Sequence, residues 1–170
     1  MENSIKAKTR DEKLQELIRS LRGQKLTVSF AESCTGGALS AFLTEQAGVS
    51  DLFLGSVVSY SNEAKMDLLG VRRDTLMNEG AVSESVARQM AHGVRQQLKT
   101  HWSVAITGIA GPTGGTPSKP VGTVCFGIVG PNFEDSRKTL FSGDRKGIQQ
   151  SSVDYAVAWL SECLEGTKKE

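Results

Sequence analysis

One stretch of the chain, residues 29–39 (SFAESCTGGAL), joins two kinds of secondary structure within a single turn. Before the turn, residues 26–30 alternate apolar and small polar side chains, which is the period of a strand. After it, residues 39–46 carry apolar side chains at helical spacing. Between the two patterns stand three side chains with a nucleophilic oxygen or sulfur, and then two glycines. We therefore expect a buried strand that turns directly into a helix.

The two glycines, Gly36 and Gly37, need a physical reason, because glycine costs about 1 kcal/mol relative to alanine inside a helix. In one interpretation Ser33 caps the helix, and the glycines let the helix pack closely against a sheet. In the other, a ligand approaches this backbone, where free N–H groups and the helix dipole favour negative charge. This stretch alone leaves both interpretations open.

Size and charge limit the classes of protein to which the chain can belong. Its 170 residues suit one domain, expected over residues 10–166 after a flexible segment 1–9. The formal net charge of +1 gives no reason to expect binding to nucleic acid or to a membrane surface. No apolar run approaches membrane-spanning length, and no hydrophobic region follows the first charges, so we expect a cytoplasmic protein.

The three cysteines are odd in number and widely spaced, which favours neither a disulfide framework nor a zinc site. Cys125 lies in an apolar strand pattern and Cys163 on the apolar side of a helical pattern, so both are predicted to be core residues. Only Cys34, in the turn described above, is a candidate for chemistry.

Strand and helix patterns alternate along the chain, which is typical of a mostly parallel sheet covered by helices on both faces. Residues 121–129 and 133–141 form a hairpin around a tight turn, so one strand must run against the others. Charged side chains suggest an edge position for 133–141, whereas the apolar segment 51–60 is predicted to be central. The sequence thus predicts a mixed sheet of about five strands. The other elements that we expect are strands at 26–30 and 102–107, and helices near 14–21, 39–46, 63–69, 74–78, 83–98 and 148–163.

Polar side chains follow the end of each strand expected to run in the common direction. Ligands bind in open α/β sheets outside the carboxyl ends of the strands, so these groups should meet at one edge. Such a concentration of polar and nucleophilic groups is more than a purely structural protein needs. The four sets are Glu32, Ser33, Cys34, Thr35, Gly36 and Gly37; Tyr60, Ser61, Asn62, Glu63 and Lys65; Thr107 and Gly108; and Gly143, Asp144 and Arg145.

The loop 108–120 holds three of the chain's four prolines and four of its glycines. Long loops in compact domains are usually functional, and this one could wrap an anionic or sugar group through its backbone N–H donors. The alternative is a mobile surface excursion. Arg145 has two interpretations as well. A cation in the first turn of a helix opposes the dipole, so it either faces an anion such as phosphate or pairs with a nearby carboxylate.

Several reaction classes are excluded by what the chain lacks. Its two histidines, His92 and His101, are badly placed for a Ser-His-Asp triad, and no group of side chains has the spacing of metal ligands. The dinucleotide-binding and P-loop glycine patterns are absent. What remains is a hydroxyl or thiol of the turn with a base other than histidine.

Lys65 can be that base if burial and nearby helix dipoles lower its pKa. Tyr60 could relay a proton, and backbone N–H groups of residues 35–37 or of Gly108 could stabilise an oxyanion. Each has a plainer interpretation: a solvated lysine, an aromatic side chain packed at a strand end and, for Thr107, a small residue ending a strand. Their joint placement favours the functional interpretation.

Four motifs, taken together and in this order, resemble the CinA C-terminal-domain family, whose characterised members are nicotinamide mononucleotide deamidases. The resemblance extends from about residue 14 to residue 164. It implies a stand-alone form without the N-terminal domain of the larger members. The motifs are AESCTGG at 31–37, VSYSNEAK at 58–65, TGIAGP at 107–112 and GDR at 143–145.

The resemblance implies a three-layer α/β/α sandwich on a mixed, mostly parallel five-stranded sheet with one antiparallel strand. It also implies hydrolysis of the carboxamide of nicotinamide mononucleotide to nicotinate mononucleotide and ammonia, without a cofactor or metal, by a homo-oligomer. Ser33 then aligns with the nucleophile and Lys65 with the base, while Tyr60 and Thr107 align with assisting positions. The substrate-binding positions implied are Glu32, Thr35, Gly36, Gly37, Asn62, Gly108, Gly111 and Arg145, with the glycine-rich loop and Arg145 at the ribose-phosphate end.

Two alternatives stay open. Cys34 could replace Ser33 as nucleophile, because a helix N-terminus can lower a thiol pKa. The chain could also be a non-catalytic module that binds a nucleotide or a protein partner, since a fold does not by itself imply an activity.

Overall fold

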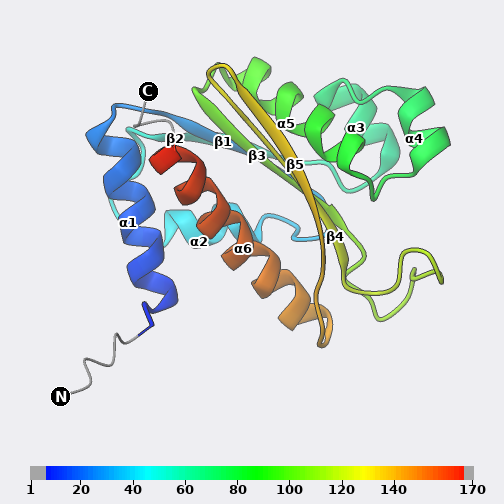
Figure 1. The fold of residues 1–170 in the computed structure, drawn as a ribbon. Coiled ribbons are helices and arrows are strands. Elements are labelled where there is room, and N and C mark those ends of the chain that lie inside the picture. Colours follow the sequence, from blue (N-terminus) through cyan, green and yellow to red (C-terminus); the bar gives the residue numbers. More distant parts are fainter. Residues whose placement is uncertain (1–6, 167–170) are drawn as a thin grey trace.

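The computed structural model describes residues 7–166, which form a mixed sheet with helices on both faces (Figure 1). The predicted segment 1–9 lies mostly outside the described residues. Within them, Thr9 caps the first helix through a capping box with Glu12. In chain order the elements are α1 (Arg10–Gly23), β1 (Val28–Glu32), α2 (Ala38–Thr44), β2 (Phe53–Val58), α3 (Asn62–Leu69), α4 (Arg73–Glu79), α5 (Glu84–Leu98), β3 (Trp102–Gly108), β4 (Thr123–Gly130), β5 (Phe133–Leu140) and α6 (Arg145–Gly166).

The five strands lie in the order β2-β1-β3-β4-β5. Strands β1, β2 and β3 are parallel, β4 is antiparallel to both of its neighbours, and β5 therefore runs with the first three. The predicted α/β class, with one antiparallel strand in a mixed five-stranded sheet, is confirmed. The carboxyl ends of four strands consequently meet at one edge of the sheet.

Two apolar cores hold the layers together, one on each face of the sheet. Helices α1, α2 and α6 cover one face, and α3, α4 and α5 cover the other (Figure 1). The alternation of strand side chains decides which core each receives: Phe30 packs against the first group of helices and its neighbour Ala31 against the second. Both faces of the central strands are thereby buried, which explains their nearly continuous apolar sequences.

The charged segment at residues 133–141 forms the edge strand β5, as predicted, but the prediction that the apolar segment 51–60 is central is wrong. Strand β2 is the opposite edge, and its side chains Leu54 and Val58 are each 46% exposed. Apolar content indicates burial of side chains, whereas edge or centre depends on the number of neighbouring strands. Strand β2 has one neighbour, β1, and its register with β1 shifts next to Gly55.

Helix α3 lies unusually close to α5 because Gly93 of α5 has no side chain. A Cβ atom at Gly93 would lie 2.0 Å from the carbonyl oxygen of Leu69, the last residue of α3. Ser61 caps the start of α3 by accepting from the amide of Ala64, and Gly70 ends it in a left-handed conformation. The position of α3 matters because it carries Lys65.

Among the described residues, no helix combines the length and the apolar character needed to cross a membrane. Nor does this part of the chain bring together three or more acidic, histidine or cysteine side chains in a way that could hold a metal ion.

Candidate functional site

The β1–α2 turn carries the first candidate functional side chain, Ser33. The backbone N–H of Ser33 donates to the carbonyl of Ile106 on β3 at 2.9 Å, which fixes the turn to the neighbouring strand. Gly36 and Gly37 follow with φ of 60° and 99°, a left-handed conformation that side chains rarely adopt. The two glycines are therefore required by the turn itself.

Glu32, not Ser33, caps helix α2. Its side chain is fully buried, and its carboxylate accepts five hydrogen bonds from the turn and the first residues of the helix. The interpretation in which Ser33 caps the helix is thus wrong, and the amides expected to be free for a ligand are partly occupied by an internal carboxylate. The donors are Thr35 Oγ1 at 2.7 Å, the amides of Gly37, Leu39 and Ser40 at 3.1, 3.0 and 2.9 Å, and Ser40 Oγ at 2.6 Å.

Lys65 meets Ser33 across the carboxyl edge of the sheet. Its Nζ donates to Ser33 Oγ at 2.9 Å and to the carbonyl oxygen of Ser59 at 2.8 Å. The Lys65 side chain is only 1% exposed. Burial lowers the pKa of its amine from the ordinary value to about 8, while the nearby Cys34 opposes that shift. A useful fraction of the amine is then neutral near pH 8, so Lys65 can accept a proton from the hydroxyl that it contacts.

Cys34 lies beside this pair, but burial makes it a poor nucleophile. Desolvation raises the pKa of the Cys34 thiol to about 12 and outweighs the opposing effect of Lys65. Only the thiolate reacts readily, so the thiol stays protonated and inert over the physiological range. The structure therefore favours Ser33 over Cys34.

Donors for an oxyanion are available in the same turn. Its backbone bonds run from Gly36 to the carbonyl of Ser33 and from Ala38 to the carbonyl of Thr35. Within the described part of the chain, the amides of Cys34 and Thr35 have no acceptor on another residue. Two N–H groups directly after the nucleophile can stabilise a developing oxyanion.

Tyr60 and Arg145 connect three segments at the same edge. Arg145, the first residue of α6, donates through Nη2 to the hydroxyl of Tyr60 and through Nη1 to the carbonyl of Gly111, each at 2.8 Å. Tyr60 is 61% exposed, so the plainer interpretation, an aromatic side chain packed at a strand end, does not hold. One turn further along α6, Gln149 donates to the carbonyl of Cys34 at 2.8 Å. The start of α6 is thus tied to both the nucleophile turn and the glycine-rich loop.

A cleft of about 820 Å³, a volume typical of small-molecule sites, opens beside this connection, and neither Ser33 nor Lys65 lines it. At the rim of the cleft, Asp144 caps the start of α6 by accepting from the amide of Gly147 at 2.8 Å. The cleft is lined by Ala110, Pro112, Val121, Gly143, Asp144, Arg145, Lys146 and Gln149.

Not every predicted residue is part of this arrangement. The Thr107 hydroxyl is buried and donates to the carbonyl of Ala81 at 2.9 Å, so it is bonded to the α4–α5 connection instead of to Ser33 or Lys65. Glu32 and Thr35 are buried and bond each other, which gives them a place beneath the turn. Asn62 is exposed at the start of α3. Gly108 is pressed against β4, where an added Cβ would lie 2.8 Å from a Val124 methyl group.

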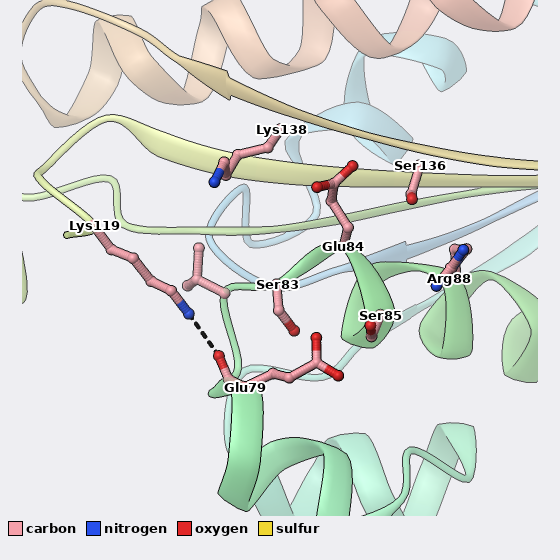
Figure 2. Close-up of a pocket in the computed structure, with 9 residues that line it drawn as sticks. Glu79, Ser83, Glu84, Ser85, Arg88, Lys119, Ser136 and Lys138 are labelled. Carbon is pink, nitrogen blue, oxygen red and sulfur yellow. Dashed lines mark hydrogen bonds between the residues drawn. The ribbon is translucent and has the colours of Figure 1, made fainter.

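A second cavity, of about 550 Å³, lies where α5 begins (Figure 2). It is lined by charged side chains of both signs, including Glu79, Glu84, Arg88 and Lys138. Lys119 of the glycine-rich loop donates there to the carbonyl of Glu79 at 2.6 Å. This bond anchors the loop to the end of α4, so the cavity borders the loop but contains neither Ser33 nor Lys65.

Sequence reasoning missed Ser59, Gln149 and Ser40. Ser59 lies inside the strand expected at 51–60 and Gln149 inside the helix expected near 148–163, whereas the candidate residues were side chains that follow strands. Ser59 instead offers a backbone carbonyl to Lys65, and Gln149 reaches the turn from an element far away in the sequence. A search for polar residues one turn into each helix that begins at this edge would have included Gln149.

Known proteins that resemble this chain belong to the CinA family. Residues 10–164 match the model of the CinA C-terminal domain. The chain is 46% identical to a CinA-like protein of Thermotoga neapolitana over 91% of its own length and 38% of the relative. It is 52% identical to a CinA-like protein of Synechocystis over 84% of its length and 33% of the relative. The chain thus spans less than two fifths of the length of these curated relatives.

Solved structures of similar size share the fold. A competence-damaged protein (CinA) superfamily protein of Klebsiella pneumoniae superposes with a TM-score of 0.90 at 34% identity, over 94% of this chain and 99% of that one. The competence/damage inducible protein CihA of Agrobacterium tumefaciens superposes with a TM-score of 0.89 at 38% identity, over 95% and 99% of the two chains.

Proposed function

Because this chain belongs to the CinA C-terminal domain family, we propose that it is an amidohydrolase that converts nicotinamide mononucleotide to nicotinate mononucleotide and ammonia. One observation supports this above all others: the buried amine of Lys65 lies 2.9 Å from the hydroxyl of Ser33. A nucleophile within hydrogen-bonding reach of a base that a third group orients is the arrangement of covalent catalysis. The carbonyl of Ser59 is that third group.

In the first half of the reaction, the neutral amine of Lys65 takes the proton of Ser33 Oγ, and the oxygen attacks the carboxamide carbon. Negative charge develops on the carboxamide oxygen, which the amides of Cys34 and Thr35 stabilise. The Lys65 ammonium then gives its proton to the amide nitrogen as the carbon–nitrogen bond breaks. Ammonia leaves, and the nicotinoyl group remains as an ester on Ser33.

In the second half, a water molecule attacks the ester carbon while Lys65 takes one of its protons. The tetrahedral intermediate collapses, and the bond to Ser33 Oγ breaks. Lys65 returns the proton to Ser33, so nicotinate mononucleotide is released and the enzyme regains its starting state.

The phosphate end of the substrate would bind where Arg145 begins α6. A guanidinium group binds a phosphate through paired hydrogen bonds that are stronger than those to neutral oxygens. Arg145 now donates to two neutral acceptors, the Tyr60 hydroxyl and the Gly111 carbonyl, which a phosphate can replace. The adjacent cleft of about 820 Å³ would hold the ribose. Assembly of the chain as a homo-oligomer stays a prediction, which sedimentation can check.

The test is ammonia release from nicotinamide mononucleotide by purified protein. Loss of the nucleophile or of the base should lower kcat by at least ~10³-fold, so we expect this from Ser33→Ala and Lys65→Ala. Cys34→Ala is the matched control in the same turn and should stay within about twofold of the wild type, since a protonated thiol does no chemistry. Undiminished turnover by Ser33→Ala with loss in Cys34→Ala would reverse the two assignments. Binding of the nucleotide without any turnover by the wild type would instead favour a non-catalytic module.

A further inference from the structure

Ser59 is buried beside the Ser33–Lys65 pair and has an unused side chain. Its amide donates to the carbonyl of Glu32 at 2.8 Å, and its own carbonyl accepts from Lys65 Nζ at 2.8 Å. Both backbone groups are therefore fixed. The side-chain hydroxyl, in contrast, is fully buried and has no hydrogen-bond partner in the described part of the chain. A buried hydroxyl without a partner is unfavourable, so its presence at this position asks for a reason.

Lys65 has the opposite deficit: its amine has one more N–H donor than it has acceptors in the described part of the chain. An ammonium group has three N–H donors, and Nζ has two acceptors among the described residues, Ser33 Oγ and the Ser59 carbonyl. To act as a base, the amine must be neutral, with two N–H bonds and one lone pair. The lone pair must then face Ser33 Oγ, so both remaining N–H bonds need acceptors elsewhere. The Ser59 carbonyl supplies one.

Two other hydroxyls at this edge have partners, and neither partner is Lys65. The Tyr60 oxygen accepts from Arg145, and the Thr107 hydroxyl donates to Ala81. The Cys34 thiol is a weak acceptor. Ser59 is different because its hydroxyl has no partner among the described residues and belongs to the residue whose carbonyl already contacts the amine.

We propose that Ser59 is a positioning residue for the amine base: its hydroxyl accepts the remaining N–H of Lys65 through one water molecule. Two N–H bonds held by one residue orient the lone pair toward Ser33. No proton passes through Ser59, which acts only through the orientation of Lys65. This inference rests on the proposed function, because an oriented lone pair matters only for a base.

Removal of the hydroxyl tests the proposal. We expect Ser59→Ala to lower the melting temperature, because one N–H of Lys65 loses its acceptor. Its kcat should also fall about 10- to 100-fold, with KM within twofold of the wild type. Ser59→Thr, which restores a hydroxyl on the same backbone, should recover most of the lost kcat.

Ser103→Ala is the matched control. Ser103 is also fully buried, but its hydroxyl donates to the carbonyl of Ala91 at 2.7 Å, away from Lys65. We expect this variant to lower the melting temperature while kcat stays within twofold. A kcat of Ser59→Ala within twofold of the wild type would overturn the proposal. So would a loss of kcat that is no greater than the loss in Ser103→Ala.

A second readout does not depend on the reaction. Nitrogen NMR of lysine side chains reports the pKa of Lys65. The titratable group that acts on this pKa is Cys34, whose own pKa is influenced by Glu32 and Arg145. A hydroxyl that accepts from the ammonium favours the charged form, so Ser59→Ala should lower the pKa of Lys65. An unchanged or raised pKa would contradict the role of Ser59 even if the wild type proved inactive toward nicotinamide mononucleotide. If the wild type is inactive but Ser59→Ala lowers the pKa of Lys65, the proposed function is wrong and the contact between Ser59 and Lys65 stands.

Discussion

Glu32 and Lys65 are two buried ionisable side chains close to Ser33, and they differ in how completely their hydrogen-bonding groups are satisfied. The carboxylate of Glu32 accepts five hydrogen bonds and caps helix α2. Among the described residues, the amine of Lys65 has two acceptors, neither of them charged. The first group is held by five donors, whereas the second is buried without a counterion in that part of the chain, and burial lowers its pKa. A fully satisfied group fixes structure, and an incompletely satisfied one is available for chemistry.

The largest effect should come from replacing Lys65 by an apolar side chain of similar length. We expect Lys65→Met to lower kcat by at least ~10³-fold, because the base is gone. It should also stabilise the fold by ~2 kcal/mol at pH 7, since it removes the cost of burying an unpaired ammonium. Ammonia release and chemical denaturation measure the two effects. A variant that loses stability together with activity would show that Lys65 is as structural as Glu32.

An effect of the opposite sign on stability is expected from Glu32→Gln. The amide nitrogen of glutamine cannot accept, so donors at one side of the former carboxylate lose their acceptor and α2 loses its cap. We expect the free energy of unfolding to fall by ~3 kcal/mol, within the range for a broken buried network. Thermal and urea unfolding measure the loss. Ser40→Ala, which removes one of the five donors, is the control and should lose less. Equal stability of Glu32→Gln and the wild type would remove the contrast between the two side chains.

The pH dependence of activity should show the lowered pKa of Lys65. Because the base must be neutral, kcat/KM should rise with pH to a plateau, with an apparent pKa near 8, and fall about tenfold for each pH unit below it. The sign for stability is the same: the unfolded chain holds this proton at pH values where the folded one has released it. Stability should therefore increase with pH from about 8 to about 10.4, the ordinary lysine value. A profile that is flat between pH 6.5 and 9 would mean that another group is the base.

Most of the fold could be predicted from the sequence, because strands and helices each give apolar side chains a characteristic spacing over a few residues. The helical spacing that became α5 and the charged hairpin strand 133–141 appear as expected, and the strand expected at 26–30 is present as β1, two residues later in the chain. The set of residues at the carboxyl edge was predictable for a related reason: parallel strands place their ends together whatever their order. Strand order itself was not predictable, and β2 was misplaced because an apolar strand reads the same at an edge as in the centre.

What the sequence by itself determined, then, is which segments form strands and helices and which polar residues arrive at one edge of the sheet. Only the tertiary structure decided what each of those residues does there. Glu32 accepts from the amides of the helix that follows it, and Thr107 donates to the carbonyl of Ala81. Lys65 donates to the hydroxyl of Ser33 and to the carbonyl of Ser59. The physical reason is that a hydrogen bond or a shifted pKa depends on distance and burial between residues far apart in the chain, and neither quantity is contained in a local pattern of side chains.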